Sequence, residues 1–223
     1  SALVRAATEG GVRLVADAEG FWLIGARGLG RLTLRGNDVS LTWSPRTDFT
    51  VRDLTISEDR MRIAVVEGAC DAGAGPDCLR LAQLRDPFEL RTLIGETERF
   101  SSLSAAGLAH AQMQGDDIVT IGAAGVHAYD TNRRNWRKLL DGRADAFFVA
   151  EDGRILVTQG NIVAEIRNGT VVNQHETQGG PFTRVAYAGA RALGLGADGS
   201  LRDLLTDVTL LGASTEVPDT AQF

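Results

Sequence analysis

The stretch Ala150–Gly169, AEDGRILVTQGNIVAEIRNG, carries the pattern that decides the fold. Asp152-Gly153 near its start and Asn168-Gly169 at its end are dipeptides that accept the positive φ angles of tight hairpin turns. Between them lie two short apolar runs, RILVTQ and IVAEI, separated by a Gly-Asn break. Short apolar runs bounded by turn residues are typical of β-strands. The stretch therefore predicts a pair of antiparallel strands.

The same arrangement recurs along the chain, which makes the stretch part of a repeated unit. Five copies align on a turn that follows one strand-like run and precedes another. The turns are Glu19-Gly20, Glu58-Asp59, Gly115-Asp116, Asp152-Gly153 and Gly189-Ala190. Their spacing is about 37–39 residues, except between the second and third copies, where extra residues are inserted. Two further strand-like runs follow in most copies, so each copy predicts about four antiparallel strands.

Repeated units of four antiparallel strands resemble the blades of β-propeller repeat proteins. The resemblance rests on the pattern and covers nearly the whole chain, without the motif of a particular propeller family. It implies an all-β fold of about five blades that form a single domain over residues 1–223. The expected blades span approximately residues 10–44, 50–95, 106–142, 144–176 and 181–213. Residues 1–8 read as a spare strand, expected to pair in the last blade and close the ring.

Composition excludes some classes of partner. The chain has 223 residues and a net charge of −6. It has no basic patch large enough to neutralise a phosphate backbone, so we expect no nucleic-acid partner. No apolar run reaches the ~20 residues that cross a bilayer as a helix. We therefore expect no membrane insertion by this segment.

The two cysteines give a prediction about the compartment. Cys70 and Cys78 flank a small, turn-forming loop, in GACDAGAGPDC. Their spacing is not that of a Cys-x-x-Cys redox motif, and a zinc site would need a second pair of ligands. A disulfide that closes a hairpin loop is the favoured interpretation, and two free thiols in a cytosolic protein remain the alternative. A disulfide favours an extracytoplasmic location: periplasmic, cell-surface or secreted.

No constellation of catalytic residues is evident. His110, His127 and His175 lie in different copies or strands without metal-ligand spacing, although His110 falls on an expected inner strand near the channel. Most acidic residues lie at or beside turns, where turn chemistry explains them. We therefore expect no catalytic residue, no metal and no cofactor.

These observations favour a non-enzymatic binding or scaffold protein of bacterial origin that engages a protein partner. The alternatives are a carbohydrate-binding or glycoside-hydrolase-like propeller, and a sensor or accessory domain of a longer membrane-anchored protein. Long connections are expected to gather on one face, and functional residues concentrate on such loops. Arginine and aromatic side chains are common in binding hot spots. The candidate binding residues are Arg46, Phe49, Arg99 and Phe100, with Asp71 and Asp77 at the cysteine loop.

Overall fold

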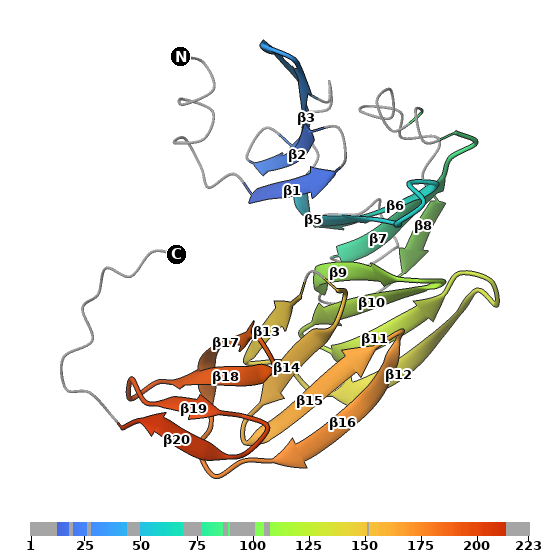
Figure 1. Ribbon diagram of the computed structural model, residues 1–223. Helices are drawn as coiled ribbons and strands as arrows, with labels where there is room; N and C mark the ends of the chain where they lie inside the picture. The colour runs from blue at the N-terminus through green and yellow to red at the C-terminus, as the bar shows by residue number, and fades with distance from the viewer. Residues whose placement is uncertain are drawn as a thin grey trace.

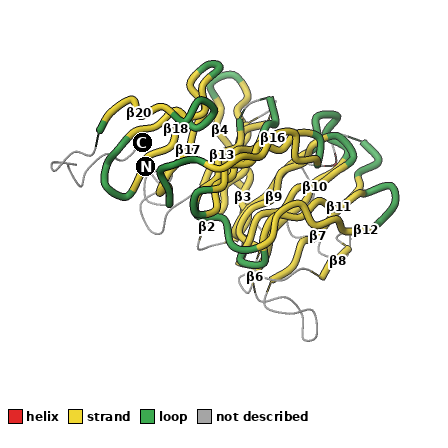
Figure 2. The backbone as a smooth tube through the Cα atoms, turned by 90° about the horizontal axis from the view of Figure 1, so that it is seen from below, coloured by secondary structure: helices red, strands yellow, loops and turns green. Residues whose placement is uncertain are grey.

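The protein is an arc of five β-sheets in the computed structural model (Figure 1). The structure describes residues 13–17, 20–25, 28–43, 50–68, 77–86, 89, 101–104, 108–150 and 152–212. These residues form strands joined by turns, and none of them lies in an α-helix (Figure 2). The expectation of an all-β fold is confirmed.

Each sheet has four antiparallel strands in chain order, and we name the sheets blades A to E. Blade A contains β1 (Arg13–Asp17), β2 (Gly20–Gly25), β3 (Gly28–Arg35) and β4 (Asp38–Trp43). Blade B contains β5 (Thr50–Ile56), β6 (Arg62–Gly68), β7 (Asp77–Gln83) and β8 (Ser101–Ser104). Blade C contains β9 (Leu108–Gln114), β10 (Asp117–Gly122), β11 (Gly125–Asp130) and β12 (Asn135–Asp141). Blade D contains β13 (Ala146–Val149), β14 (Ile155–Gln159), β15 (Ile162–Arg167) and β16 (Thr170–Glu176). Blade E contains β17 (Phe182–Ala188), β18 (Arg191–Gly196), β19 (Leu201–Asp203) and β20 (Val208–Leu211).

The opening stretch forms the centre of blade D, as its sequence predicts. Its two apolar runs are β14 and β15, paired from Ile155↔Ile166 to Gln159↔Ile162. The turn that leads into β16 has positive φ at both Asn168 (49°) and Gly169 (64°). This conformation is the one that a two-residue hairpin with a right-handed twist requires.

Adjacent blades pack face to face and bury a separate apolar cluster at each junction. One cluster joins blades A and B, and the other three join B to C, C to D and D to E. The cluster between blades C and D holds Val119, Ile121, Val126, Leu140, Ile155, Val157, Ala164 and Ile166. A single blade could not bury both of its faces, so the stacking of blades is what forms the core. This architecture confirms the β-propeller prediction.

Two details differ from the sequence-based expectation or lie beyond the structure. The second blade does not end near residue 95, because its fourth strand is Ser101–Ser104, paired with β7. Residues 1–8, the expected closing strand, lie outside the described residues. Within the described residues, blade E consists of β17–β20 alone, and blades A and E share no apolar cluster. They stand at the two ends of the arc (Figure 1).

Candidate functional site

The strand directions divide the connections between two faces of the arc. We define the long-connection face as the end of the blades where β5 begins at Thr50, β9 at Leu108 and β13 at Ala146. The short-turn face is the opposite end, where the first two strands of each blade meet in tight turns. All five turns on which the repeat was aligned join the first two strands of a blade, as predicted.

Strand register places the start of β5, together with Gly68 and Asp77 on either side of the cysteine loop, at the long-connection face. Arg46 and Phe49 precede β5, which begins there at Thr50. The cysteine loop joins Gly68 to Asp77 at the same end of blade B, because Gly68 pairs with both Thr50 and Asp77. The side chains of Arg46, Phe49, Asp71 and Asp77 lie outside the described residues.

The strand β8 follows Arg99 and Phe100 in the sequence, and its direction is described by its pairing with β7. Ser104 pairs with Cys78 near the long-connection face, whereas Ser101 pairs with Leu81, further toward the short-turn face. Three strand residues span about 10 Å. β8 therefore runs from the short-turn side of blade B toward the long-connection face. Arg99 and Phe100 lie outside the described residues, so the expectation that the four residues centre on one face stays a prediction.

A hollow of about 430 Å³ opens on the long-connection face near the centre of the arc. Three consecutive blades contribute to it through their innermost strands: Arg52 on β5, Ala109 on β9 and Phe147 on β13. Further lining comes from Leu108, Ile121, Gly122, Ala123, Arg143, Ala144 and Asp145. The floor is thus largely apolar, and the charged side chains come from the inner strand of blade B and the connection between blades C and D.

Phe147 is the exposed aromatic side chain of this hollow. It is 36% exposed, and its ring lies 4.8 Å, centroid to centroid, from the ring of His110. His110 is buried, and its Nδ1 makes a close polar contact with the carboxylate of Asp53 on β5. His110 therefore lies on the inner strand β9, as expected, and its ring packs against the ring of Phe147. Two rings in contact hold the aromatic surface in place.

Arginines surround this aromatic surface. The Arg52 guanidinium donates a hydrogen bond to the carbonyl oxygen of Leu108 over 3.1 Å, which holds it at the junction of blades B and C. Asp145 accepts a hydrogen bond from the backbone N–H of Gly160 over 2.5 Å and so braces the connection that carries Arg143. Arg143 is exposed. The hollow offers an apolar floor, one presented aromatic ring and guanidinium groups at its edge.

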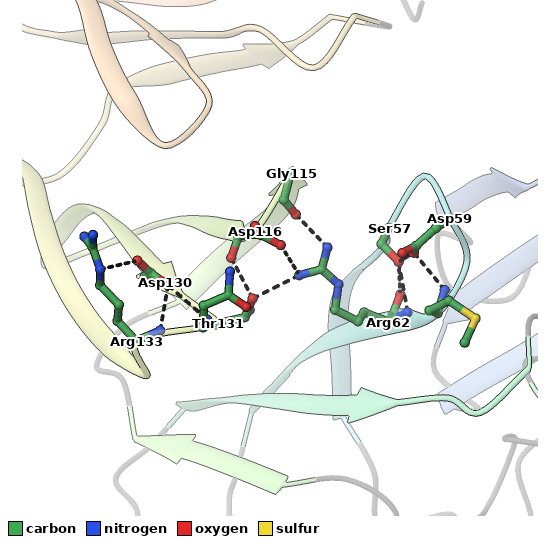
Figure 3. A network of polar contacts seen from close by, with 10 residues as sticks. Ser57, Asp59, Arg62, Gly115, Asp116, Asp130, Thr131 and Arg133 are labelled. Atoms are coloured by element: carbon green, nitrogen blue, oxygen red, sulfur yellow. Dashed lines mark hydrogen bonds and ion pairs between the residues drawn. The ribbon is translucent and has the colours of Figure 1, made fainter.

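The short-turn face carries a polar network that joins blades B and C (Figure 3). The Arg62 guanidinium donates to the carbonyl oxygen of Gly115 over 2.8 Å and to Oγ1 of Thr131 over 2.9 Å. It also lies 3.3 Å from a carboxylate oxygen of Asp116. Thr131 in turn donates to the carbonyl oxygen of Asp116 over 2.8 Å. The Arg62 side chain thus links blade B to blade C through these contacts.

A second cavity, of about 730 Å³, lies on this face among the turns of blades B, C and D. Two of its carboxylates, those of Asp59 and Asp152, accept hydrogen bonds from other residues of the turns in which they lie. Ser57 Oγ and the N–H of Met61 donate to Asp59, and the first of these bonds contributes most to lowering the pKa of Asp59. The backbone N–H of Arg154 likewise contributes most to lowering the pKa of Asp152. These contacts agree with the interpretation of both acids as turn residues.

The described residues contain no group of three or more His, Cys, Asp or Glu side chains that could hold a metal ion. No helix within the described part of the chain is long and apolar enough to cross a membrane. Cys78 is fully buried and is not a free thiol. Cys70 lies outside the described residues, so the Cys70–Cys78 pairing stays a prediction.

Sequence comparisons find no matching protein-family model and no similar curated protein. Solved structures do match. PorZ, described as an essential bacterial surface component of the type-IX secretion system of Porphyromonas gingivalis, has a TM-score of 0.61 and 16% identity over 91% of this chain. The WD40 β-propeller domain of Doa1 has a TM-score of 0.58 and 9% identity over 91% of this chain. YCF48, solved with a D1 peptide, has a TM-score of 0.54 and 11% identity over 86% of this chain.

The matched region is 26% of the PorZ chain, 68% of the Doa1 chain and 65% of the YCF48 chain. This chain therefore spans about a quarter of PorZ. At such low identities the likeness reports the fold and not the activity. Five four-stranded antiparallel blades and these structural neighbours together show that the protein has a β-propeller fold.

Proposed function

We propose that this protein is a non-enzymatic propeller that acts outside the cytoplasm and binds a partner protein through the hollow on its long-connection face. The observation that carries the proposal is the position of Phe147. It is a large apolar side chain presented to solvent at the centre of the arc, within a hollow that arginines border. Aromatic and arginine side chains dominate the binding energy of protein interfaces.

The chemistry of the hollow suggests the kind of segment that it binds. Its apolar floor fits one or two apolar side chains, and Arg52 and Arg143 suit a carboxylate beside them. We therefore propose an extended peptide segment that carries an acidic residue next to an apolar one. The YCF48 propeller, whose structure contains a bound D1 peptide, gives a precedent for peptide binding by this fold.

The extracytoplasmic part of the proposal has separate support. The predicted Cys70–Cys78 disulfide favours an oxidising compartment. PorZ, described as a bacterial surface component, shares the fold. Doa1, described only by its WD40 propeller domain, shares it too, so the fold by itself does not assign a compartment.

A selection experiment tests the binding proposal without a known partner. The protein is immobilised and a phage-displayed library of random peptides is selected on it. Enriched peptides are then titrated against Phe147→Ala and Arg143→Ala variants. Removing a hot-spot side chain costs about 2 kcal/mol or more, so we expect affinity to fall at least about tenfold for Phe147→Ala. Arg143→Ala is expected to weaken acidic peptides selectively.

The matched control is Arg133→Ala. Arg133 follows β11 in a turn on the short-turn face, and its side chain is 79% exposed. The Arg133→Ala substitution therefore removes one exposed guanidinium and changes no residue that lines the hollow. Phe49→Ala and Phe100→Ala extend the test to two of the binding residues predicted from the sequence. The proposal fails if no peptide is enriched, or if binding survives Phe147→Ala and is lost in Arg133→Ala.

A further inference from the structure

Asn168-Gly169 is the only Asn-Gly dipeptide in the sequence. It forms the turn between β15 and β16 of blade D, with positive φ at both residues. Asn168 is exposed, and it borders the cavity on the short-turn face. Water therefore reaches Asn168, and the chemical stability of its side chain depends on the groups around the turn.

An Asn-Gly dipeptide can lose its side-chain amide without an enzyme. The backbone nitrogen of the glycine attacks Cγ of the asparagine, so that a new N–C bond forms and the bond from Cγ to the side-chain nitrogen breaks. The side-chain nitrogen leaves as ammonia, with the proton that the glycine N–H gives up, and a succinimide remains. Water then opens the succinimide at either C–N bond and leaves aspartate or isoaspartate. Glycine has no side chain that would hinder the attack.

Gln114 binds the N–H group that this attack needs. Its Oε1 accepts a hydrogen bond from the backbone N–H of Gly169 over 2.9 Å. A neutral carboxamide oxygen accepts such a bond, but it is far too weak a base to remove the proton. The Gly169 nitrogen therefore keeps its proton, and the bond fixes the direction in which the N–H points. Attack on Asn168 requires this hydrogen bond to break.

The Gln114 side chain is itself fixed in place. It comes from β9 of blade C and is only 7% exposed. Its Nε2 donates to the carbonyl oxygen of Gly153, in the turn between β13 and β14. One carboxamide of blade C thus contacts two turns of blade D, with its oxygen on a donor and its nitrogen on an acceptor. Leaving either group unpaired inside the junction would be costly.

Asp117 closes the other side of Gly169. A Cβ added at Gly169 would collide with the Asp117 carboxylate, so the glycine backbone lies directly against that side chain. Arg137 holds Asp117 in place, because its guanidinium donates to the carboxylate over 2.8 Å. Gly169 is buried between these two side chains of blade C. Its N–H can leave Gln114 only if the turn moves away from blade C.

We propose that Asn168 is a deamidation site that Gln114 keeps unreactive while its turn lies against blade C. Deamidation then proceeds only from molecules in which the turn has separated from blade C, and its rate follows the population of that open state. An isoaspartate product has one more carbon atom in the main chain, which a two-residue hairpin turn does not accommodate. Gln114 thus protects the turn from a change that would prevent its return to blade C.

The test compares rates of deamidation in folded variants during incubation at mildly alkaline pH. Cleavage after Glu165 and Glu176 releases one peptide that contains both Asn168 and Asn173, and mass spectrometry locates the converted residue in it. Gln114→Met keeps the length of the side chain and removes both of its hydrogen bonds. We expect deamidation at Asn168 to become about tenfold faster, because the bond that closes the turn against blade C is lost.

Gln112→Met is the matched control. Gln112 lies on the same strand and borders the same cavity, and its Nε2 donates to the carbonyl oxygen of its own neighbour, Met113, over 3.2 Å. Its substitution is expected to leave the rate at Asn168 unchanged. Asn173 on β16 is an internal control, because it reports opening of the whole strand pair and not of the turn alone. Its rate is expected to be the same in all variants.

The wild-type protein gives an independent comparison. Its Asn168 is expected to deamidate much more slowly than the same residue in a synthetic peptide of residues 166–176. Gln114→Asn, which withdraws the carboxamide from Gly169, replaces Gln114→Met if circular dichroism shows that variant to be unfolded. Equal rates in the wild-type protein and the peptide overturn the proposal. So does an unchanged rate in the folded Gln114 variant, an equal acceleration in Gln112→Met, or an acceleration that Asn173 shares.

Discussion

The Asp53 carboxylate on β5 accepts a hydrogen bond from the backbone N–H of Ala111 on β9, over 3.0 Å. Two residues along each strand, Thr55 Oγ1 accepts from the N–H of Met113 over 2.9 Å. β9 is the inner edge of blade C, so these N–H groups have no strand partner on that side. Side chains of one blade thus satisfy the open edge of the next, at a place where unpaired buried N–H groups would be costly.

Asp53→Ala is expected to destabilise the protein strongly. It leaves the N–H of Ala111 buried without its partner and removes the polar contact to His110 Nδ1. We expect the free energy of unfolding to fall by about 2–4 kcal/mol, measured by urea denaturation. Asp141→Ala is the control, because the Lys138–Asp141 pair is exposed and such pairs contribute little. If Asp53→Ala lowers the free energy of unfolding by less than Asp141→Ala does, then the contacts of Asp53 with blade C do not stabilise the fold.

Gly169→Ala tests the turn that ends the opening stretch. A Cβ at Gly169 would collide with the carboxylate of Asp117, and the residue also has an unfavourable φ of 64°. Gly160→Ala has a nearly equal φ of 59° and open space around the added methyl. We expect Gly160→Ala to cost about 1 kcal/mol and Gly169→Ala clearly more, in thermal denaturation. Equal costs would mean that Asp117 moves aside freely.

Asp59 makes part of the stability depend on pH. Hydrogen bonds from Ser57 Oγ and the N–H of Met61 lower its folded-state pKa below the ordinary value of 3.8. The unfolded state therefore takes up the proton first as pH falls. The stabilisation is fully present above the unfolded pKa and is lost as pH falls through the folded pKa. We expect wild type to be more stable than Asp59→Ala at pH 7, with a difference that shrinks toward pH 3. A difference that stays constant would show that the hydrogen bonds do not favour the ionised form.

The disulfide prediction is checked by mass spectrometry of protein digested without reduction. A peptide that links Cys70 to Cys78 is expected, with no thiol alkylated before reduction. In the chain-entropy model, a bridge of this span stabilises the fold by about 2–3 kcal/mol. Reduction is therefore expected to lower the midpoint of thermal unfolding. Two alkylated thiols would overturn the bridge and remove its support for an extracytoplasmic location.

The blade pattern could be predicted from the sequence because it is local. Turn dipeptides such as Asp152-Gly153 and apolar runs such as Ile155–Gln159 carry their own signal within a few residues. The fourth strand of blade B was not predicted, because it has no such local signal. Ser101–Ser104 is short and polar, whereas the segment FELRTLIG before it looks more like a strand. Pairing with β7 defines β8, and pairing across twenty residues leaves no local trace.

The central hollow could not be predicted because it is not local. Arg52 and Phe147 are far apart in the sequence and meet only when blades B, C and D are stacked. Nothing in the immediate sequence of Phe147 separates it from the other apolar residues of its strand. Only the packing shows that Ala146 is buried while Phe147 lines the hollow.

Hydrogen exchange with a bound peptide tests the central claim most directly. The probe is the tightest peptide from the library selection, and exchange is followed by mass spectrometry with and without it. Our account predicts slower exchange in residues 50–54 and 142–149, which border the hollow on the long-connection face, and no change in residues 57–62 or 167–169. Protection confined to residues 57–62 and 167–169 would place the binding site on the short-turn face and contradict the account.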